Sequence, residues 1–341
     1  IGWCDWSSDV CSSDLGSAFA SWTPVAINPL TGRPHLVFQG SSNFSVFHEH
    51  KESGVWTTET IGYAGIGGYD PEIAMDPQGH AHVVYNDWYE DRIVYATDQS
   101  GAWQLTTVDE TYNLLLDPAI ALDAAGFVHI VFMCREMDNF LRYATNRGGT
   151  WRVENIATDD YQSFLMPRIA VTADDTVFIA YHHAGDLYLT EKAVYEDQWQ
   201  TAMVAADADS SVDLLRADRN GRPHLAYMAD DPTSGEPTAY YAYRDAGQWL
   251  VETVGVAGDF LTSMILDGED FAHLTYLTAD DRLRYATNMT GDWTEATLDP
   301  FGSVRVFLAI DGYNLIHAVY TSDSTLWHNV FPRGYTNEEI Q

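Results

Sequence analysis

A unit of about 47 residues recurs seven times along this chain and limits its fold more than any other feature. Each unit holds an aromatic residue three positions after a site that is histidine in six of the seven units, and a closing tryptophan follows in six of the seven. A period in this range, with several short strand-like runs per unit, is typical of the blades of a β-propeller. The histidine position is occupied by His35, His82, His129, Phe178, His224, His273 and His317, and the closing position by Trp56, Trp103, Trp151, Trp199, Trp249, Trp293 and, in the seventh unit, Tyr335.

The second unit shows why each copy is predicted to be a small antiparallel sheet. Asp76-Pro-Gln-Gly79 has type I turn preferences, with Asp first, Pro second and Gly fourth. The flanking residues 72–75 and 80–85 are apolar or alternate as strands do. We therefore predict an all-β fold, a seven-bladed β-propeller of four-stranded antiparallel blades. The predicted blades span about residues 24–62, 71–109, 118–157, 167–205, 212–254, 262–298 and 306–340, and blades one and seven each contain four strands, so ring closure does not require a strand exchanged between the termini.

Residues 1–15 have no place in the repeat. They contain the run D-W-S-S-D-V-C-S-S-D-L, which is similar to an in-frame translation of a short-read sequencing adapter, and the chain does not begin with Met. We interpret residues 1–15 as an adapter-derived or disordered segment and residues 16–341 as a single propeller domain whose native N-terminus, with any signal peptide, has been lost. Cys134 is then the one native cysteine, so no disulfide framework and no zinc pattern is predicted.

The chain is strongly acidic, with 50 Asp and Glu against 17 Lys and Arg and a formal net charge of −33. This charge excludes nucleic acid and anionic membrane surfaces as partners, because both carry the same sign. No apolar run approaches the ~18 residues needed to cross a bilayer. We expect an extracellular or periplasmic protein without membrane insertion, present as a monomer or as a module of a larger chain.

The repeated polar residues are interpreted as structural. A histidine beside an aromatic residue and the repeat tryptophan can bury its ring and hydrogen-bond across blades. The repeated aspartates fit turn chemistry, and they are Asp76, Asp123, Asp218, Asp267 and Asp311. No metal ligand and no cofactor is assigned. Residues 207–213 space carboxylates as a calcium loop does, but Val212 and Asp218 replace the expected Gly and Glu, so a structural calcium ion is only weakly indicated.

Function is expected where the repeats differ, in the loops between the second and third strands and in the connections between blades. Aromatic rings beside arginines and carboxylates are suited to gripping sugars by stacking and bidentate hydrogen bonds. The predicted ligand-binding residues are Trp88, Tyr89, Arg92, Arg135, Glu136 and Tyr161.

The turn before each closing tryptophan resembles a known motif. Ala144-Thr-Asn-Arg-Gly-Gly-Thr-Trp151 is similar to the Asp-box of sialidase-type (BNR-repeat) propellers, S-x-D-x-G-x-T-W, with Ala and Asn in place of Ser and Asp. The resemblance implies a propeller fold and a structural role for this turn. The arginine triad and the nucleophile of a sialidase are not matched.

A second resemblance is to the propeller polysaccharide lyases such as ulvan lyases, and it is carried by Tyr181-His-His-Ala-Gly-Asp-Leu-Tyr188. Here Phe178 replaces the repeat histidine while two histidines follow, and a local break in a repeat can mark function. The resemblance implies β-elimination on a uronate polymer. Arg135 would neutralise the carboxylate, His182 or His183 would take the C5 proton, and Tyr112 or Tyr161 would protonate the leaving oxygen.

The leading hypothesis is an extracellular, non-catalytic bacterial propeller that recognises carbohydrate or protein ligands through its loop face. The alternative from another class is a polysaccharide lyase, and a sialidase-type glycoside hydrolase ranks below it.

Overall fold

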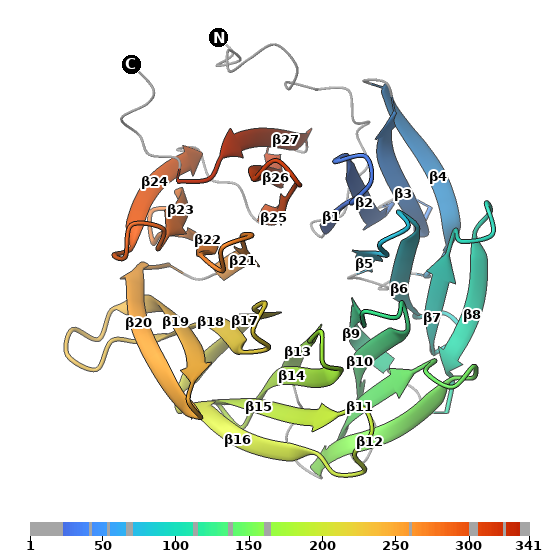
Figure 1. Cartoon of the computed structure of the whole chain (residues 1–341), viewed down its shortest axis with the longest axis horizontal. Helices are drawn as coiled ribbons and strands as arrows, with labels where there is room; N and C mark the ends of the chain where they lie inside the picture. The colour runs from blue at the N-terminus through green and yellow to red at the C-terminus, as the bar shows by residue number, and fades with distance from the viewer. Residues whose placement is uncertain are drawn as a thin grey trace.

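The chain folds into a ring of seven blades, a seven-bladed β-propeller (Figure 1), as predicted. The computed structural model describes residues 23–334 except 41–42, 53–54, 66–70, 112–114, 136–138, 160–164, 259–260, 300–305 and 323–324. Among these residues no helix is long and apolar enough to cross a membrane. Six blades have four strands, and blade seven has three within the described residues, because its predicted fourth strand, with Tyr335, lies outside them.

The strands run in chain order from the axis outward in every blade, as antiparallel meanders (Figure 1). Blade one holds β1 (Val25–Ile27), β2 (Pro34–Gln39), β3 (Ser45–Glu52) and β4 (Val55–Tyr63). Blade two holds β5 (Glu72–Met75), β6 (Ala81–Asp87), β7 (Arg92–Thr97) and β8 (Gln104–Asp109). Blade three holds β9 (Leu115–Leu122), β10 (Val128–Arg135), β11 (Asn139–Thr145) and β12 (Arg152–Asp159). Blade four holds β13 (Leu165–Val171), β14 (Thr176–His183), β15 (Asp186–Ala193) and β16 (Gln200–Ala205). Blade five holds β17 (Ala208–Ala217), β18 (Pro223–Asp230), β19 (Pro237–Asp245) and β20 (Gln248–Val256). Blade six holds β21 (Leu261–Leu266), β22 (Ala272–Leu277), β23 (Leu283–Thr287) and β24 (Thr294–Asp299). Blade seven holds β25 (Val306–Ile310), β26 (Leu315–Ser322) and β27 (Thr325–Pro332).

The repeated aspartate shapes the turn between the first and second strands of its blade. Oδ1 of Asp76 accepts hydrogen bonds from the backbone N–H groups of Gln78 (2.9 Å) and His80 (2.8 Å). Gly79 closes the turn with a φ of +85°, in the left-handed region where a glycine has no Cβ to clash. The same pair of backbone bonds recurs at Asp123, Asp218, Asp267 and Asp311, which confirms the predicted turn role.

The second oxygen of this aspartate faces the repeat histidine, and the other side of the histidine meets a tyrosine of the third strand. His129 Nε2 lies 3.4 Å from Asp123 Oδ2, and His129 Nδ1 lies 2.5 Å from the Tyr143 hydroxyl. A neutral ring with its proton on Nε2 suits both neighbours. We call this arrangement the Asp–His–Tyr relay. It recurs as Asp76–His82–Tyr95, Asp218–His224–Tyr241 and Asp267–His273–Tyr285.

The relay corrects one expectation from the sequence. The histidines are buried as predicted, but they hydrogen-bond within their own blade and not across blades. The reason is the antiparallel register, which places the histidine between the turn of its own sheet and the neighbouring strand of the same sheet.

Blade four replaces all three members of the relay together. Thr172, Phe178 and Leu189 occupy the aspartate, histidine and tyrosine positions. A single replacement would leave a buried polar group without its partner, whereas a concerted one leaves a consistent apolar site. The break at Phe178 therefore has a packing explanation that does not involve a functional site.

Neighbouring blades are joined by the closing tryptophans, five of which stack edge-on against an aromatic ring of the preceding blade, whereas Trp249 packs against the apolar cluster that includes Leu189. Trp199 lies 5.2 Å from Tyr143 between ring centroids, at an interplanar angle of 75°. Trp56 lies 6.0 Å from His328, so the same contact joins blade one to blade seven and closes the ring. The remaining contacts of this kind are Trp103 with His48, Trp151 with Tyr95 and Trp293 with Tyr241, and Phe331 contacts Tyr285 at the end of blade six.

We predict that Tyr143→Phe destabilises the protein by about 1–3 kcal/mol, because the phenyl ring keeps its packing while the buried Nδ1 of His129 loses its partner. Tyr313→Phe is the matched control, since it removes a hydroxyl from a side chain that is 82% exposed, and it should cost much less than Tyr143→Phe. Chemical unfolding at pH 7.5 measures both values. Equal costs for the two variants would contradict the relay as a stabilising unit.

The relay also predicts a pH dependence. Burial lowers the pKa of His82, His129, His224 and His273, although the facing aspartate raises it. The unfolded chain, where the pKa is about 6.5, therefore binds more protons than the folded chain below that pH. Stability should be complete above about pH 6.5 and should fall below it, and each of these rings contributes a slope approaching about 1.4 kcal/mol per pH unit.

Unfolding free energies measured between pH 7.5 and pH 5 test this expectation. The triple variant Asp123→Thr, His129→Phe and Tyr143→Leu carries the residues of blade four and should reduce the limiting slope by one proton, about 1.4 kcal/mol per pH unit. A stability that stays constant down to pH 5 would show that these rings do not control acid unfolding.

Candidate functional site

The meander places two kinds of connection at opposite ends of the blades. The loops between second and third strands, and the connections between blades, lie on one face, which we call the loop face. The tight turns after the first and third strands lie on the other, which we call the turn face. Residues at the end of β6, β10 and β14 therefore belong to the loop face, and the relay lies near the turn face.

Three aromatic side chains are exposed together on the loop face of blades one and two. Tyr63, Trp88 and Tyr89 are 47%, 39% and 74% exposed, and the rings of Tyr63 and Tyr89 meet edge-on at 6.5 Å. The loop is held in place because the Trp88 backbone N–H donates to the Ala64 carbonyl at 2.8 Å. Gly65 lies beneath it at a φ of +75°, where a Cβ would approach the Tyr89 backbone nitrogen to 2.9 Å. Trp88 and Tyr89 were predicted from the sequence as ligand-binding residues, and Tyr63, from the connection between the two blades, lies against Tyr89.

Arg92 lies in the same loop region, and its position is fixed by a buried carboxylate. The guanidinium donates from Nε (3.0 Å) and Nη2 (2.8 Å) to Oδ2 of Asp87, which is buried. Two bonds to one anchored acceptor limit the rotamers of Arg92, while part of its side chain remains exposed.

The described residues that were proposed for lyase chemistry lie at the loop-face ends of the second strands of blades three and four. Arg135 is the last residue of β10, and His182 and His183 end β14. His182 is buried, whereas His183 is partly exposed with its ring 6.3 Å from Tyr188. Tyr112, Glu136 and Tyr161 lie outside the described residues. The roles of all these residues remain predictions.

A partly buried carboxylate, Asp117, lies near Arg135. Burial raises the pKa of Asp117, while the positive charges of Arg168 and Arg135 lower it. Asp117 and Arg168 belong to the innermost strands β9 and β13, so a charged group borders the axis beside the ends of β10 and β14. Neither residue was selected from the sequence, because nothing in the repeat marks which strand positions face the axis.

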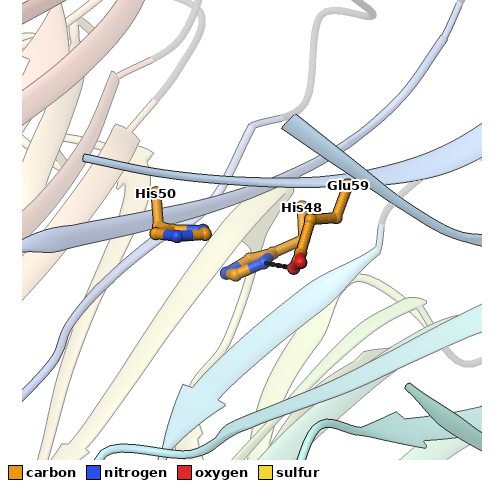
Figure 2. Close-up of side chains that lie close together, drawn as sticks. All are labelled: His48, His50 and Glu59. Carbon is orange, nitrogen blue, oxygen red and sulfur yellow. Dashed lines mark hydrogen bonds and ion pairs between the residues drawn. The ribbon is translucent and has the colours of Figure 1, made fainter. Parts of the chain in front are cut away.

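A hollow of about 290 Å³ opens on the turn face between blades one and two. Three histidines and a glutamate line it beside Trp103, and Figure 2 shows His48, His50 and Glu59 side by side. His48 Nδ1 is 3.3 Å from Glu59 Oε2, and His48 Nε2 is 2.9 Å from His35 Nδ1. This group was not predicted from the sequence. The signal available was His48-Glu-His50 on an expected strand, whose alternation places both histidines on one face.

The remaining predicted positions have structural surroundings. Cys134 is buried in the core between blades two and three. The segment 207–213 lies mostly in strand β17, and the side chains of residues 209–213 lie outside the description. In the turn that resembles an Asp-box, Asn146 Oδ1 accepts the backbone N–H of Val128 at 2.8 Å, and Asp98 and Asn288 do the same for Ala81 and Ala272. This motif therefore ties the outer turn to the second strand.

No protein-family model and no curated protein matches this chain, but solved structures with a similar fold do. An ulvan lyase of polysaccharide lyase family PL25, bound to -[GlcA(1-4)Rha3S]-, superposes with a TM-score of 0.62 at 12% identity, over 93% of this chain and 94% of that chain. The SapL1 lectin in complex with alpha methyl fucoside gives 0.55 at 11% identity over 93% and 95%. The Aleuria aurantia lectin in complex with alpha-methyl-L-fucoside gives 0.53 at 12% identity over 83% and 97%. At these identities the likeness shows the propeller fold.

Proposed function

We propose that this protein is a non-catalytic carbohydrate-recognition propeller that binds sugar on the loop face of blades one and two. The observation that carries the proposal is the exposed cluster of Tyr63, Trp88 and Tyr89. Large aromatic side chains gain free energy when they leave water, so three held together at the surface suggest a ligand that covers them. Sugar rings offer apolar C–H faces that stack on such side chains, and their hydroxyl groups remain available for hydrogen bonds.

Arg92 supplies the polar part of this proposed site. Its guanidinium is already held by Asp87, so a sugar hydroxyl or carboxylate that approaches it meets a donor with little rotational freedom left to lose. A compact cluster of this size suits a saccharide better than a protein partner, whose stable interfaces cover about 800 Å² on each side. The net charge of −33 opposes the approach of polyanions and favours a neutral or weakly charged sugar.

The structural neighbours are consistent with this proposal. Two lectins and a polysaccharide lyase with similar propellers were solved with sugars bound. Sugars of this kind are encountered outside the cytoplasm, so an extracellular or periplasmic bacterial location is part of the proposal.

We expect Trp88→Ala with Tyr89→Ala to weaken binding of a cognate saccharide at least about tenfold, equivalent to about 1.4 kcal/mol. Glycan-array screening of the wild-type protein identifies the saccharide, and isothermal titration calorimetry measures the affinities. Tyr313→Ala is the matched control, because Tyr313 is 82% exposed in a turn on the opposite face. Unchanged affinity in the double variant, or an equal loss in the control, would refute a site at this cluster.

A second candidate function is a polysaccharide lyase that acts at the ends of blades three and four. The partial exposure of His183 beside Tyr188, on a blade next to Arg135, favours it. A histidine that takes the C5 proton must reach solvent, which His183 does and the buried His182 does not. Arg135 would stabilise the charge that develops on the uronate carboxylate.

The lyase candidate predicts a rise in the ultraviolet absorbance of unsaturated uronate when the protein is mixed with one acidic polysaccharide from a panel. His183→Ala should then lower kcat at least about 100-fold, because general base catalysis contributes 10²–10⁴-fold. The same rate in His183→Ala as in the wild type would exclude this residue as the base. Saccharide binding without any absorbance change would support the recognition function over the lyase.

A further inference from the structure

Blade one departs from the repeat at two neighbouring positions, and both departures introduce a histidine. His48 stands where four other blades place the relay tyrosine, as at Tyr95 and Tyr143. His50 stands opposite His35, where three other blades place threonine: Thr97, Thr145 and Thr287. Two histidines therefore replace residues that need no metal, on one strand of one blade.

The fold brings a carboxylate to the same point. Strand β4 pairs with β3 so that Glu59 lies opposite His48, and His48 and His50 project from one face of β3. The ligand atoms of His48, His50 and Glu59 all lie within 4.8 Å of one another (Figure 2). We propose that these three side chains form a binding site for a divalent transition metal of the zinc class, at the boundary between blades one and two.

The distances suit a tetrahedral ion. Ligand atoms 2.0–2.2 Å from a tetrahedral zinc ion lie about 3.3–3.5 Å from one another. The 3.3 Å between His48 Nδ1 and Glu59 Oε2 already has this value. His50 closes the remaining gap, at most about 1.4 Å, by a small rotation of a side chain that borders the open hollow.

The surroundings orient the ligands as the outer shell of a metal site does. His48 Nε2 lies 2.9 Å from His35 Nδ1, and His48 Nδ1 lies 3.3 Å from Glu59 Oε2. With a metal ion bound at Nδ1, His48 would keep its proton on Nε2 and donate it to His35, whereas without the metal Nδ1–H can donate to Glu59. The indole N–H of Trp103 donates to Glu59 Oε2 at 3.2 Å and holds the carboxylate from the next blade. Bonds of this kind fix the tautomer of a ligating histidine and the orientation of a ligating carboxylate.

An unpaired polar atom supports the assignment. Nδ1 of His50 is buried and has no hydrogen-bond partner among the described residues. Several other histidine nitrogens share this state, but among the described atoms of this kind only that of His50 belongs to a residue that lines the hollow, where a metal ion would provide its partner. Glu59 alone would not indicate a metal, since Glu154 and Glu252 accept the same tryptophan bond in blades three and five without a histidine pair.

The donor set selects the metal class. Two imidazole nitrogens and one carboxylate suit zinc and other late transition metals, whereas calcium and magnesium require mostly oxygen ligands. Three protein ligands leave a fourth position that faces the hollow of about 290 Å³, where a water molecule or a ligand group has room to bind.

Zinc titration of the full chain, stripped with EDTA and dialysed, tests the proposal. Calorimetry should show one zinc ion per chain, and Tm should rise with the logarithm of the zinc concentration, whereas equal concentrations of calcium or magnesium should leave Tm unchanged. His50→Thr installs the residue that three other blades carry, and Glu59→Gln keeps an oxygen for Trp103 to donate to. Each should weaken zinc binding at least tenfold while retaining the far-ultraviolet circular dichroism of the wild type.

His80→Phe is the matched control. His80 is a second partly exposed histidine on the turn face, and blades three and six carry Phe127 and Phe271 at its position, so this variant should bind zinc as the wild type does. A visible cobalt(II) spectrum of a tetrahedral nitrogen–oxygen site in the wild type, lost in His50→Thr, would support the same assignment. Zinc affinity that is unchanged in both His50→Thr and Glu59→Gln, or lost in His80→Phe alone, would overturn it.

Discussion

A buried histidine needs a hydrogen-bond partner for each of its two ring nitrogens. The way in which the repeat histidines meet this need links most of the propeller. The turn aspartate fixes the first turn through backbone bonds and presents its second oxygen to the histidine. The tyrosine that meets the other nitrogen is also the ring against which the next blade stacks its tryptophan. One hydrogen-bonded unit therefore links turn geometry, strand register and the contact between blades. Because the histidine and the tyrosine hydroxyl are buried together, the loss of one leaves the other without its partner, whereas the aspartate keeps an arginine or, for Asp76, His80.

This coupling explains how individual blades differ. Blade four exchanges aspartate, histidine and tyrosine for Thr172, Phe178 and Leu189, and the Thr172 hydroxyl bonds the backbone of its own turn at Thr176. Blades one and seven keep the histidine but meet it with a second one, as His35 with His48 and His317 with His328. In blade one a third ring, His50, and the carboxylate of Glu59 join the pair. The same blade scaffold therefore accepts different side chains at the relay positions when the interacting residues are replaced together.

A rigid ring also determines where function can be added. The relay and the stacked tryptophans hold the blades near the turn face, so the loops at the opposite end vary without disturbing them. Trp88 and Tyr89 are placed there by the Ala64 carbonyl and by a glycine at position 65 that allows close approach. Arg92 is anchored by Asp87. These contacts turn a variable loop into a surface with a defined arrangement of aromatic and basic groups.

The sequence by itself determined the number of blades, the turn at each aspartate and the burial of the histidines, because all three follow from a period, a turn preference and a polarity pattern that are local in the chain. It also indicated Trp88 and Tyr89, since a variable loop rich in aromatic residues is visible without coordinates. Only the tertiary structure decided that the histidines bond within their own blade, that Phe178 belongs to a concerted apolar exchange, and that Tyr63 joins the exposed cluster. It alone brought Glu59 to His48 and His50. These outcomes depend on strand register and on which neighbours a fold brings together, and a one-residue shift in register would turn each side chain to the opposite face of its sheet.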